Sequence, residues 1–281
     1  MNTVRELLQQ AAEMGLRGEA RLDAELLLCA AIGRARSYLY AWPEAEVASQ
    51  AAQHFLAQAQ RRAAGEPLAY LTGEREFYGR RFAVDPAVLI PRADTETLLE
   101  AALSRLPRGT PAQVLDLGTG SGILAISVAL ERPQASVWAL DRSAQALQLA
   151  QRNADSLGAR VHWLCSDWFA ALPADARFDL ILANPPYLAA DDPHLDALRH
   201  EPRSALVAAE DGLADLAHLI VTAPQHLAPG GWLLLEHGAT QGAAVRRMLE
   251  AAHYAEIATL LDLEQRERVS LGRTPAIAMP R

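Results

Sequence analysis

The sequence contains no lysine: all 26 of its basic residues are arginine, which we interpret as a coding bias without functional meaning. It has only two cysteines, Cys29 in an expected helix and Cys165 in an expected buried strand. A disulfide framework is therefore not expected, and a reducing compartment is indicated. The sequence also lacks an apolar run of the roughly 20 residues that span a bilayer, and it begins with an amphipathic pattern that has no signal-peptide core. We expect a cytoplasmic protein without membrane contact.

Positive charge is also scarce, because the formal net charge is −8 and the isoelectric point is about 5.5. This balance argues against a tight, non-specific grip on nucleic-acid backbones, although it leaves room for a local basic patch. Hydrophobic residues make up 51% of the chain and charged residues 21%, which is typical of a soluble globular protein. A length of 281 residues fits one large domain and a smaller one.

The first quarter of the chain has helical periodicity. Apolar residues recur at helical spacing over residues 1–73, and they predict a small bundle that includes helices at 22–32 and 45–64. This region contains no catalytic constellation, so we expect it to dock a substrate. Residues 74–92 form a predicted linker with a hairpin at 78–86.

Residues 93–281 are predicted to form the larger domain, beginning with a helix that Asp94 or Thr95 caps. Strands and helices then alternate, which favours a mostly parallel sheet with helices on both faces. The last two expected strands are separated by a short polar turn and should form an antiparallel pair at the sheet edge. The expected strands are 114–117, 136–141, 160–165, 178–183, 231–236, 257–262 and 268–272.

A glycine-rich loop, residues 118–122, follows the first of these strands and precedes a helix at 123–130. Glycine lets a backbone approach a ligand closely, and a helix start offers free N–H groups. The spacing departs from the dinucleotide fingerprint because position 123 is Ile and the third glycine comes one residue early. A nicotinamide cofactor is therefore disfavoured.

Acidic and aromatic residues end the next two strands. Asp141 is placed to accept hydrogen bonds from ribose hydroxyls, and Asp167 with Trp168 could recognise an adenine amine and cover its face. Asp141 could instead cap the following helix, and Trp168 could be a core residue. Because the carboxyl ends of parallel strands meet at one edge of a sheet, we expect these residues to share one site.

The strand at 178–183 is followed by Asn184-Pro185-Pro186-Tyr187. Each proline fixes its own φ, lacks an N–H and pushes the preceding residue toward extended geometry. The resulting stiff turn exposes one side-chain amide, one free carbonyl and one aromatic ring. These groups suit a planar –NH2 group, either a carboxamide or the exocyclic amine of a base; an ordinary strand-ending turn is the alternative.

Over residues 113–281, the order of glycine loop, acidic residue, Asp-Trp and Asn-Pro-Pro-Tyr resembles the class I S-adenosylmethionine-dependent methyltransferases. The resemblance implies a Rossmann-like, seven-stranded, mostly parallel α/β fold and S-adenosylmethionine as cofactor. By this resemblance, the cofactor-binding residues are Gly118, Thr119, Gly120, Ser121, Gly122, Asp141, Asp167, Trp168 and Asn184. Asn184, Pro185 and Tyr187 would carry catalysis by holding the acceptor amide, without a general base or a metal. We expect Glu236 and His237, at the end of the fifth strand, to have a structural hydrogen-bonding role.

Further segments resemble the peptide chain release factor glutamine methyltransferases, namely residues 66–73, 77–79, 89–96 and 201–206. That resemblance implies N5 methylation of the glutamine in the Gly-Gly-Gln loop of class 1 release factors, which act in translation termination. The acceptor-binding residues would be Asn184, Pro185, Pro186 and Tyr187. We expect a monomer that does not bind nucleic acid. Family members often have Thr where this chain has Ser121.

Three alternatives remain open at this point. One is the related enzyme that acts on a glutamine of a ribosomal protein, which shares the Asn-Pro-Pro-Tyr turn. Another is an adenine-N6 nucleic-acid methyltransferase, which would need a basic channel for a flipped base. The third is a catalytically silent cofactor-binding module, against which the intact turn at 184–187 argues.

Overall fold

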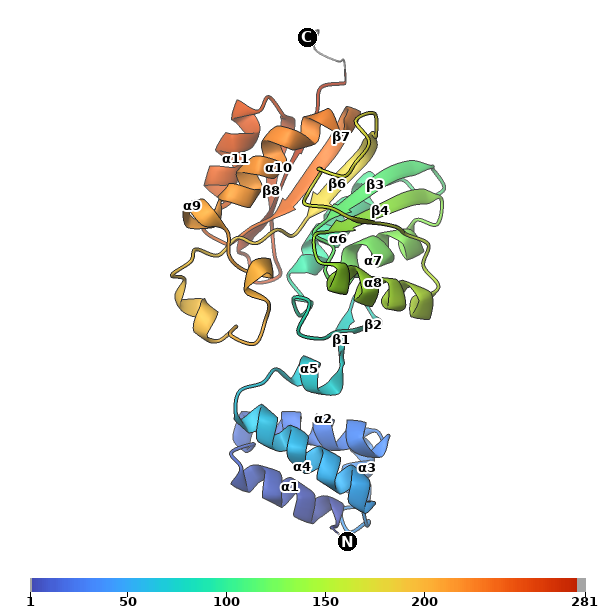
Figure 1. The fold of residues 1–281 in the computed structure, drawn as a ribbon, viewed down its shortest axis with the longest axis vertical. Helices are drawn as coiled ribbons and strands as arrows, with labels where there is room; N and C mark the ends of the chain where they lie inside the picture. Colours follow the sequence, from blue (N-terminus) through green and yellow to red (C-terminus); the bar gives the residue numbers. More distant parts are fainter. Residues whose placement is uncertain (1, 277–281) are drawn as a thin grey trace. The chain divides into compact units, whose positions relative to one another are not determined.

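The computed structural model describes residues 2–276, which fall into two compact units, Met1–Glu74 and Arg75–Arg281. Each unit has its own hydrophobic core. Figure 1 shows the element order along the chain. Across the described residues, no helix combines the length and the apolar character that crossing a membrane requires.

The first unit is helical. Its elements are α1 (Val4–Glu13), η1 (Gly18–Ala20), α2 (Arg21–Ile32), α3 (Arg36–Ala41), α4 (Ser49–Ala63) and α5 (Leu68–Thr72). The expected helix over 45–64 is too long at its start. Backbone groups of residues 43–47 hydrogen-bond to residues 2–5 instead, with Val47 N donating to the Asn2 carbonyl at 2.9 Å. This tertiary pairing keeps residues 45–48 extended, so α4 begins only at Ser49.

The second unit opens with a hairpin of β1 (Glu74–Phe77) and β2 (Arg80–Ala83). The sequence placed this hairpin too late, at 78–86. The turn of the hairpin consists of Tyr78 and Gly79. Both residues have a positive φ, +49° and +70°, as the two central residues of a type I′ hairpin turn do.

Seven strands form the main sheet of the second unit. They are β3 (Ala112–Leu117), β4 (Ala135–Asp141), β5 (His162–Cys165), β6 (Phe178–Ala183), β7 (Leu227–Glu236), β8 (Ala255–Leu261) and β9 (Glu267–Arg273). Their spatial order is β5-β4-β3-β6-β7-β9-β8, and β9 pairs antiparallel with both β7 and β8, whereas the other pairs are parallel. The predicted seven-stranded sheet with a closing antiparallel pair is thereby confirmed.

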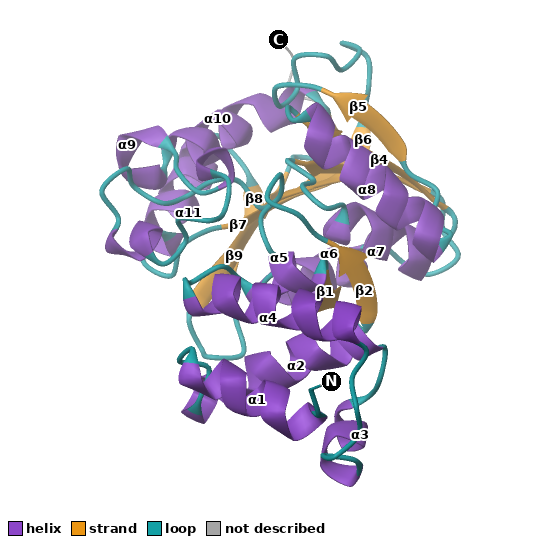
Figure 2. Cartoon of the chain, turned by 60° about the horizontal axis from the view of Figure 1, so that its bottom comes forward, coloured by secondary structure: helices purple, strands orange, loops and turns teal. Residues whose placement is uncertain are grey.

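Helices cover both faces of this sheet, as Figure 2 shows. The helices and 3-10 turns of the unit are α6 (Thr95–Arg105), α7 (Ile123–Glu131), α8 (Ala144–Leu157), η2 (Pro193–Asp196), η3 (Arg203–Ala205), α9 (Ala209–Gly212), α10 (Ala214–Thr222), η4 (Ala223–Gln225) and α11 (Gly242–Ala251). Alternate residues of each strand enter different cores: Val114 packs with α6 and α7, whereas Leu115 packs with α10 and α11. Burial on both faces makes the central strand β6 a nearly continuous apolar run.

The strand order reverses between β3 and β6. From β3 the sheet continues through β4 and β5 on one side, and from β6 it continues through β7, β9 and β8 on the other. Leu117 and Ala183 are paired at the ends of these two strands. Gly118 and Asn184 therefore leave the sheet side by side, at the switch point where parallel sheets bind ligands.

Candidate active site

A cavity lies at the carboxyl edge of β3, β4 and β6. Among the residues named from the sequence, those that line it are Gly118, Thr119, Gly120, Ser121, Asp141, Asp167, Trp168, Asn184 and Pro186. Gly122, Pro185 and Tyr187 are not in this lining. As expected, the ends of three strands and the turn at Asn184 therefore surround one cavity.

The glycine loop folds back onto β4. The backbone N–H groups of Gly118 and Thr119 both donate to the Leu140 carbonyl, at 2.8 and 2.9 Å. Gly122 has a φ of +84°, and a Cβ built on it would lie 2.8 Å from Cδ1 of Ile126. The third glycine is therefore required by its backbone conformation and by its close contact with α7, which it precedes.

Two buried polar residues that the sequence analysis missed hold this loop. Asp116 Oδ2 accepts hydrogen bonds from the Thr119 hydroxyl at 2.6 Å and from the Ala125 N–H at 3.1 Å, which joins the loop to the first turn of α7. Burial raises the pKa of Asp116 to about 7. Asn153 of α8 donates to the Ser121 carbonyl at 2.9 Å.

Asn153 also pairs with both backbone groups of Ala83, accepting from its N–H at 2.8 Å and donating to its carbonyl at 3.0 Å. One side chain thus ties the hairpin to the glycine loop. An asparagine inside an apolar helix face was the available sequence signal, but the sequence alone did not show its partners.

Asp141 does not cap α8, because the Ser143 side chain accepts from the Ala146 N–H in that role. The Asp141 carboxylate instead accepts from the Gly120 N–H at 2.9 Å and the Ser143 N–H at 2.8 Å. Each carboxylate oxygen can accept more than one hydrogen bond, so capacity for ligand hydroxyls remains at the cavity wall.

Trp168 has a left-handed backbone, with a φ of +45°. The Ser166 hydroxyl holds this turn by donating to the Trp168 carbonyl at 2.8 Å and accepting from the Ala171 N–H at 3.0 Å. The indole ring both packs against the apolar core and lines the cavity. A contact between Trp168 and an adenine stays a prediction. Cys165, expected to be buried, is exposed because β5 is an edge strand.

The Asn184 side chain donates from Nδ2 to the Thr95 hydroxyl at 3.3 Å. Oδ1 is therefore the amide atom left for a ligand. Tyr187 continues the turn, and its carbonyl accepts from Gln241 Nε2 at 3.0 Å. Burial raises the pKa of the Tyr187 hydroxyl, so this group stays protonated and cannot serve as a base.

A second cavity continues from the turn on the side of Tyr187. Its lining includes Asp192, Leu198 and the segment 238–241. The residues common to the linings of both cavities are Leu89, Arg92, Asn184 and Ala205. Asn184 consequently stands where the two cavities meet.

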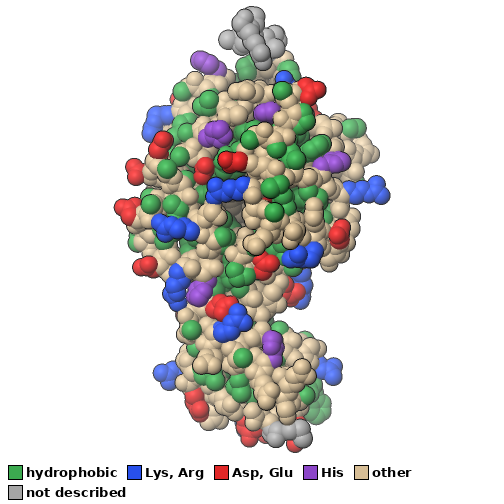
Figure 3. Space-filling model, in the orientation of Figure 1, with side chains coloured by type: hydrophobic (Ala, Val, Ile, Leu, Met, Phe, Trp, Pro, Cys, Tyr) green, Lys and Arg blue, Asp and Glu red, His purple; other side chains and the backbone are tan. Residues whose placement is uncertain are grey.

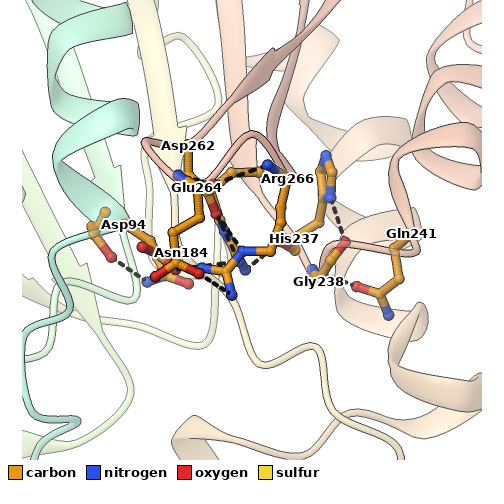
Figure 4. A network of polar contacts seen from close by, with 10 residues as sticks. Asp94, Asn184, His237, Gly238, Gln241, Asp262, Glu264 and Arg266 are labelled. Carbon is orange, nitrogen blue, oxygen red and sulfur yellow. Dashed lines mark hydrogen bonds and ion pairs between the residues drawn. The ribbon is translucent and has the colours of Figure 1, made fainter.

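The segment 89–96 supports the turn through its polar side chains. Arg92 pairs with Glu201, whose other carboxyl oxygen accepts from a backbone N–H of the same segment. Asp94 was expected to cap α6, but its side chain makes no capping bond; it pairs with Arg266 at 3.1 Å and Arg268 at 3.2 Å. Figure 4 shows Asp94 and Arg266 in a network of polar contacts that also contains Asn184.

His237 makes only structural contacts. Its Nε2 lies 2.8 Å from the Ser270 hydroxyl and its Nδ1 lies 2.9 Å from the Gly238 carbonyl. Burial lowers the pKa of His237, which keeps the ring neutral. This agrees with the hydrogen-bonding role expected for it.

The sheet order and the glycine loop at the switch point define a class I methyltransferase. The chain matches the family model "Methyltransferase small domain" over residues 93–255 and "PrmC N-terminal domain" over residues 2–73. It belongs to the release factor glutamine methyltransferase family. The member from Burkholderia pseudomallei is 47% identical over 285 residues, covering 98% of this chain and 100% of that protein. The member from Salmonella typhimurium is 50% identical over 256 residues, covering 90% of this chain and 92% of that protein.

Solved structures agree on the fold. A methyltransferase from Pyrococcus furiosus superposes with a TM-score of 0.55 at 16% identity, covering 71% of this chain and 91% of that one. At this level of identity the likeness concerns the fold alone.

Proposed function

We propose that this protein transfers a methyl group from S-adenosylmethionine to the side-chain nitrogen N5 of the glutamine in the Gly-Gly-Gln loop of class 1 release factors. The proposal rests chiefly on the position of Asn184 in the lining of both cavities. The first cavity would hold the cofactor and the second the acceptor peptide, so the two would meet at this amide. Family membership supports the choice of acceptor.

The residues of the first cavity fit the cofactor. Asp141 would accept hydrogen bonds from the ribose hydroxyls. Asp167 and Trp168 would bind the adenine by recognising its amine and covering its face. The backbone of residues 118–122 would lie against the remainder of the molecule, since glycine permits close approach. When bound, S-adenosylmethionine supplies an activated methyl group, and the rest of catalysis falls to residues of the chain.

The chain's task is to activate a poor nucleophile. An amide nitrogen has its lone pair delocalised into the carbonyl, so it must be oriented and its positive charge stabilised as the new bond forms. Asn184 Oδ1 and the Pro185 carbonyl would accept the two N–H groups of the glutamine, which achieves both. Orientation alone can contribute several kcal/mol, up to about 7–11 in ideal cases. No general base is needed, because the methylated nitrogen becomes strongly acidic and loses its proton to solvent.

Charge favours a protein acceptor over nucleic acid. The net charge is −8. On the face of the described residues seen in Figure 3, acidic and basic side chains are interspersed, and no continuous basic area covers it. A duplex with a flipped base would need such an area, since phosphate contacts supply most of its affinity.

The test is a competition for label. Purified protein would be given methyl-labelled S-adenosylmethionine together with an intact release factor, ribosomal proteins and nucleic acid. We expect label in the release factor, and none when its Gly-Gly-Gln glutamine is replaced by alanine. Label only in ribosomal protein or nucleic acid would overturn the proposal.

The Asn184→Ala variant tests the grip on the amide. It should lose transfer by at least about 100-fold, as removal of one preorganised electrostatic contact does in other enzymes, while its unfolding midpoint stays near that of the wild type. Near-normal turnover by a folded Asn184→Ala protein would show that the amide is not held in this way.

A further inference from the structure

Glu236 ends β7 beside the catalytic turn. Ala183 of β6 and Leu235 of β7 are paired in register, so the next residues along the two parallel strands, Asn184 and Glu236, are also neighbours. The Glu236 side chain is 1% exposed, and one of its carboxyl oxygens, Oε2, has no hydrogen-bond partner. A buried acid beside the acceptor-binding amide calls for an explanation beyond packing, because burying an unpaired polar atom is costly.

The contacts of Glu236 lead to that amide. The side chains of Thr95 and Asn184 both lie beside the Glu236 carboxyl and lower its pKa, against the effect of burial. Thr95 in turn accepts from Asn184 Nδ2 at 3.3 Å. The three side chains come from the start of α6, the end of β6 and the end of β7, and they form one connected set.

We infer that Glu236, together with Thr95, is a positioning residue that fixes which way the Asn184 amide faces; this inference rests on the proposed function. An ionised carboxylate only accepts hydrogen bonds, so the group it faces on Asn184 must be the NH2. Oδ1 is then turned toward the acceptor. A protonated or amidated side chain at position 236 could also donate, and it would allow Asn184 to flip and present the wrong atom.

The charged and titratable groups around Glu236 are Arg268, Asp94 and Tyr187. Arg268 of β9 favours the ionised form, Asp94 at the start of α6 opposes it, and the Tyr187 hydroxyl lies nearby. Arg268 is itself paired with Asp262 at 3.1 Å and with Asp94 at 3.2 Å, so its charge is shared between these two carboxylates and Glu236. Burial outweighs these influences and raises the pKa of Glu236 to about 7. The proton therefore binds and leaves within the working pH range.

The first test is the Glu236→Gln variant, with a release factor as acceptor. We expect kcat to fall roughly 10- to 100-fold, since misplacement of a catalytic contact by an ångström costs about that much. The KM for the release factor and the Kd for the cofactor should change less than about twofold. The wild-type kcat should decline as the pH drops below about 7, and this limb should be absent in Glu236→Gln.

A second pair of variants covers the case in which Glu236→Gln does not fold. Thr95→Val removes the hydroxyl at constant shape and should lower kcat at unchanged cofactor affinity, whereas Thr95→Ser keeps the hydroxyl and should restore most of kcat. Glu267→Gln, a half-buried acid of β9 that pairs with Arg246, is the matched control and should behave as the wild type.

The outcomes separate this inference from the proposed function. If the wild type methylates the release factor but folded Glu236→Gln retains full kcat with the same acid limb, Glu236 does not position Asn184. Equal kcat for Thr95→Val and Thr95→Ser would overturn the shared role of Thr95. If the wild type leaves the release factor unlabelled, the proposed function itself fails.

Discussion

Asn153→Ala tests how the glycine loop is held. Asn153 is 3% exposed and makes three hydrogen bonds, two with the backbone of Ala83 and one with the Ser121 carbonyl. Alanine removes all three and leaves the backbone groups without these partners. At about 1 kcal/mol for each bond, the free energy of unfolding of the second unit should fall by about 3 kcal/mol.

The expected loss is large enough to measure. For a unit of this size, each kcal/mol lowers the melting midpoint by roughly 2–4 °C, so the midpoint should drop by about 6–12 °C. Four of the five tryptophans lie in residues 75–281, so fluorescence reports mainly on this unit during heating or urea unfolding. The cofactor should also bind more weakly to Asn153→Ala, because the Ser121 carbonyl loses its anchor.

The matched control is Gln151→Ala, an exposed site on the same helix, where the change should stay within about 0.5 kcal/mol. A loss below about 1 kcal/mol for Asn153→Ala would refute the reasoning, since it would mean that water or a backbone shift replaces all three bonds. An equal loss for Gln151→Ala would assign the effect to the helix and not to the hydrogen bonds.

Two further predictions concern the loop and the first unit. Gly122→Ala should weaken cofactor binding at least tenfold in calorimetry and destabilise the fold by about 1–2 kcal/mol, because its φ is +84° and its Cβ would press on Ile126. The control is Gly109→Ala, which has a φ of +78° but open space around the added Cβ and should leave cofactor affinity unchanged. We also propose that residues 1–73 dock the release factor, so their deletion should impair methylation of the intact factor far more than cofactor binding; equal loss of both would point to a structural role.

The central strands were predictable because burial on both faces leaves little ambiguity in the sequence. The run at 178–183 became β6 with the same bounds, Phe178–Ala183. Errors arose where a tertiary contact overrides the local pattern. Residues 45–48 are extended because they pair with the N-terminus, and the hairpin is shifted because Tyr78 adopts a positive φ.

The positions of the candidate site residues were predictable from the order of the strand ends. The hydrogen-bond and ion-pair partners that hold these residues were not. Asp94 looked like a helix cap, and its actual partners, Arg266 and Arg268, lie about 170 residues further along the chain. Asp141 looked able to cap α8, but Ser143 takes that place. The pairing of Asp94 depends on strand order, which hydrophobic periodicity does not encode, whereas the choice between Asp141 and Ser143 is local.

Strand order also explains why the segment 92–96 lies beside the turn at 184–187. Arg92 binds Glu201 at the border of both cavities, Asp94 binds the arginines of β9, and Thr95 binds Asn184. These contacts exist only because α6 crosses the sheet beside β6, β7 and β9. A class I sheet alone brings a cofactor loop next to a strand end; we propose that the polar side chains of 92–96 add the fixed orientation that an amide acceptor needs.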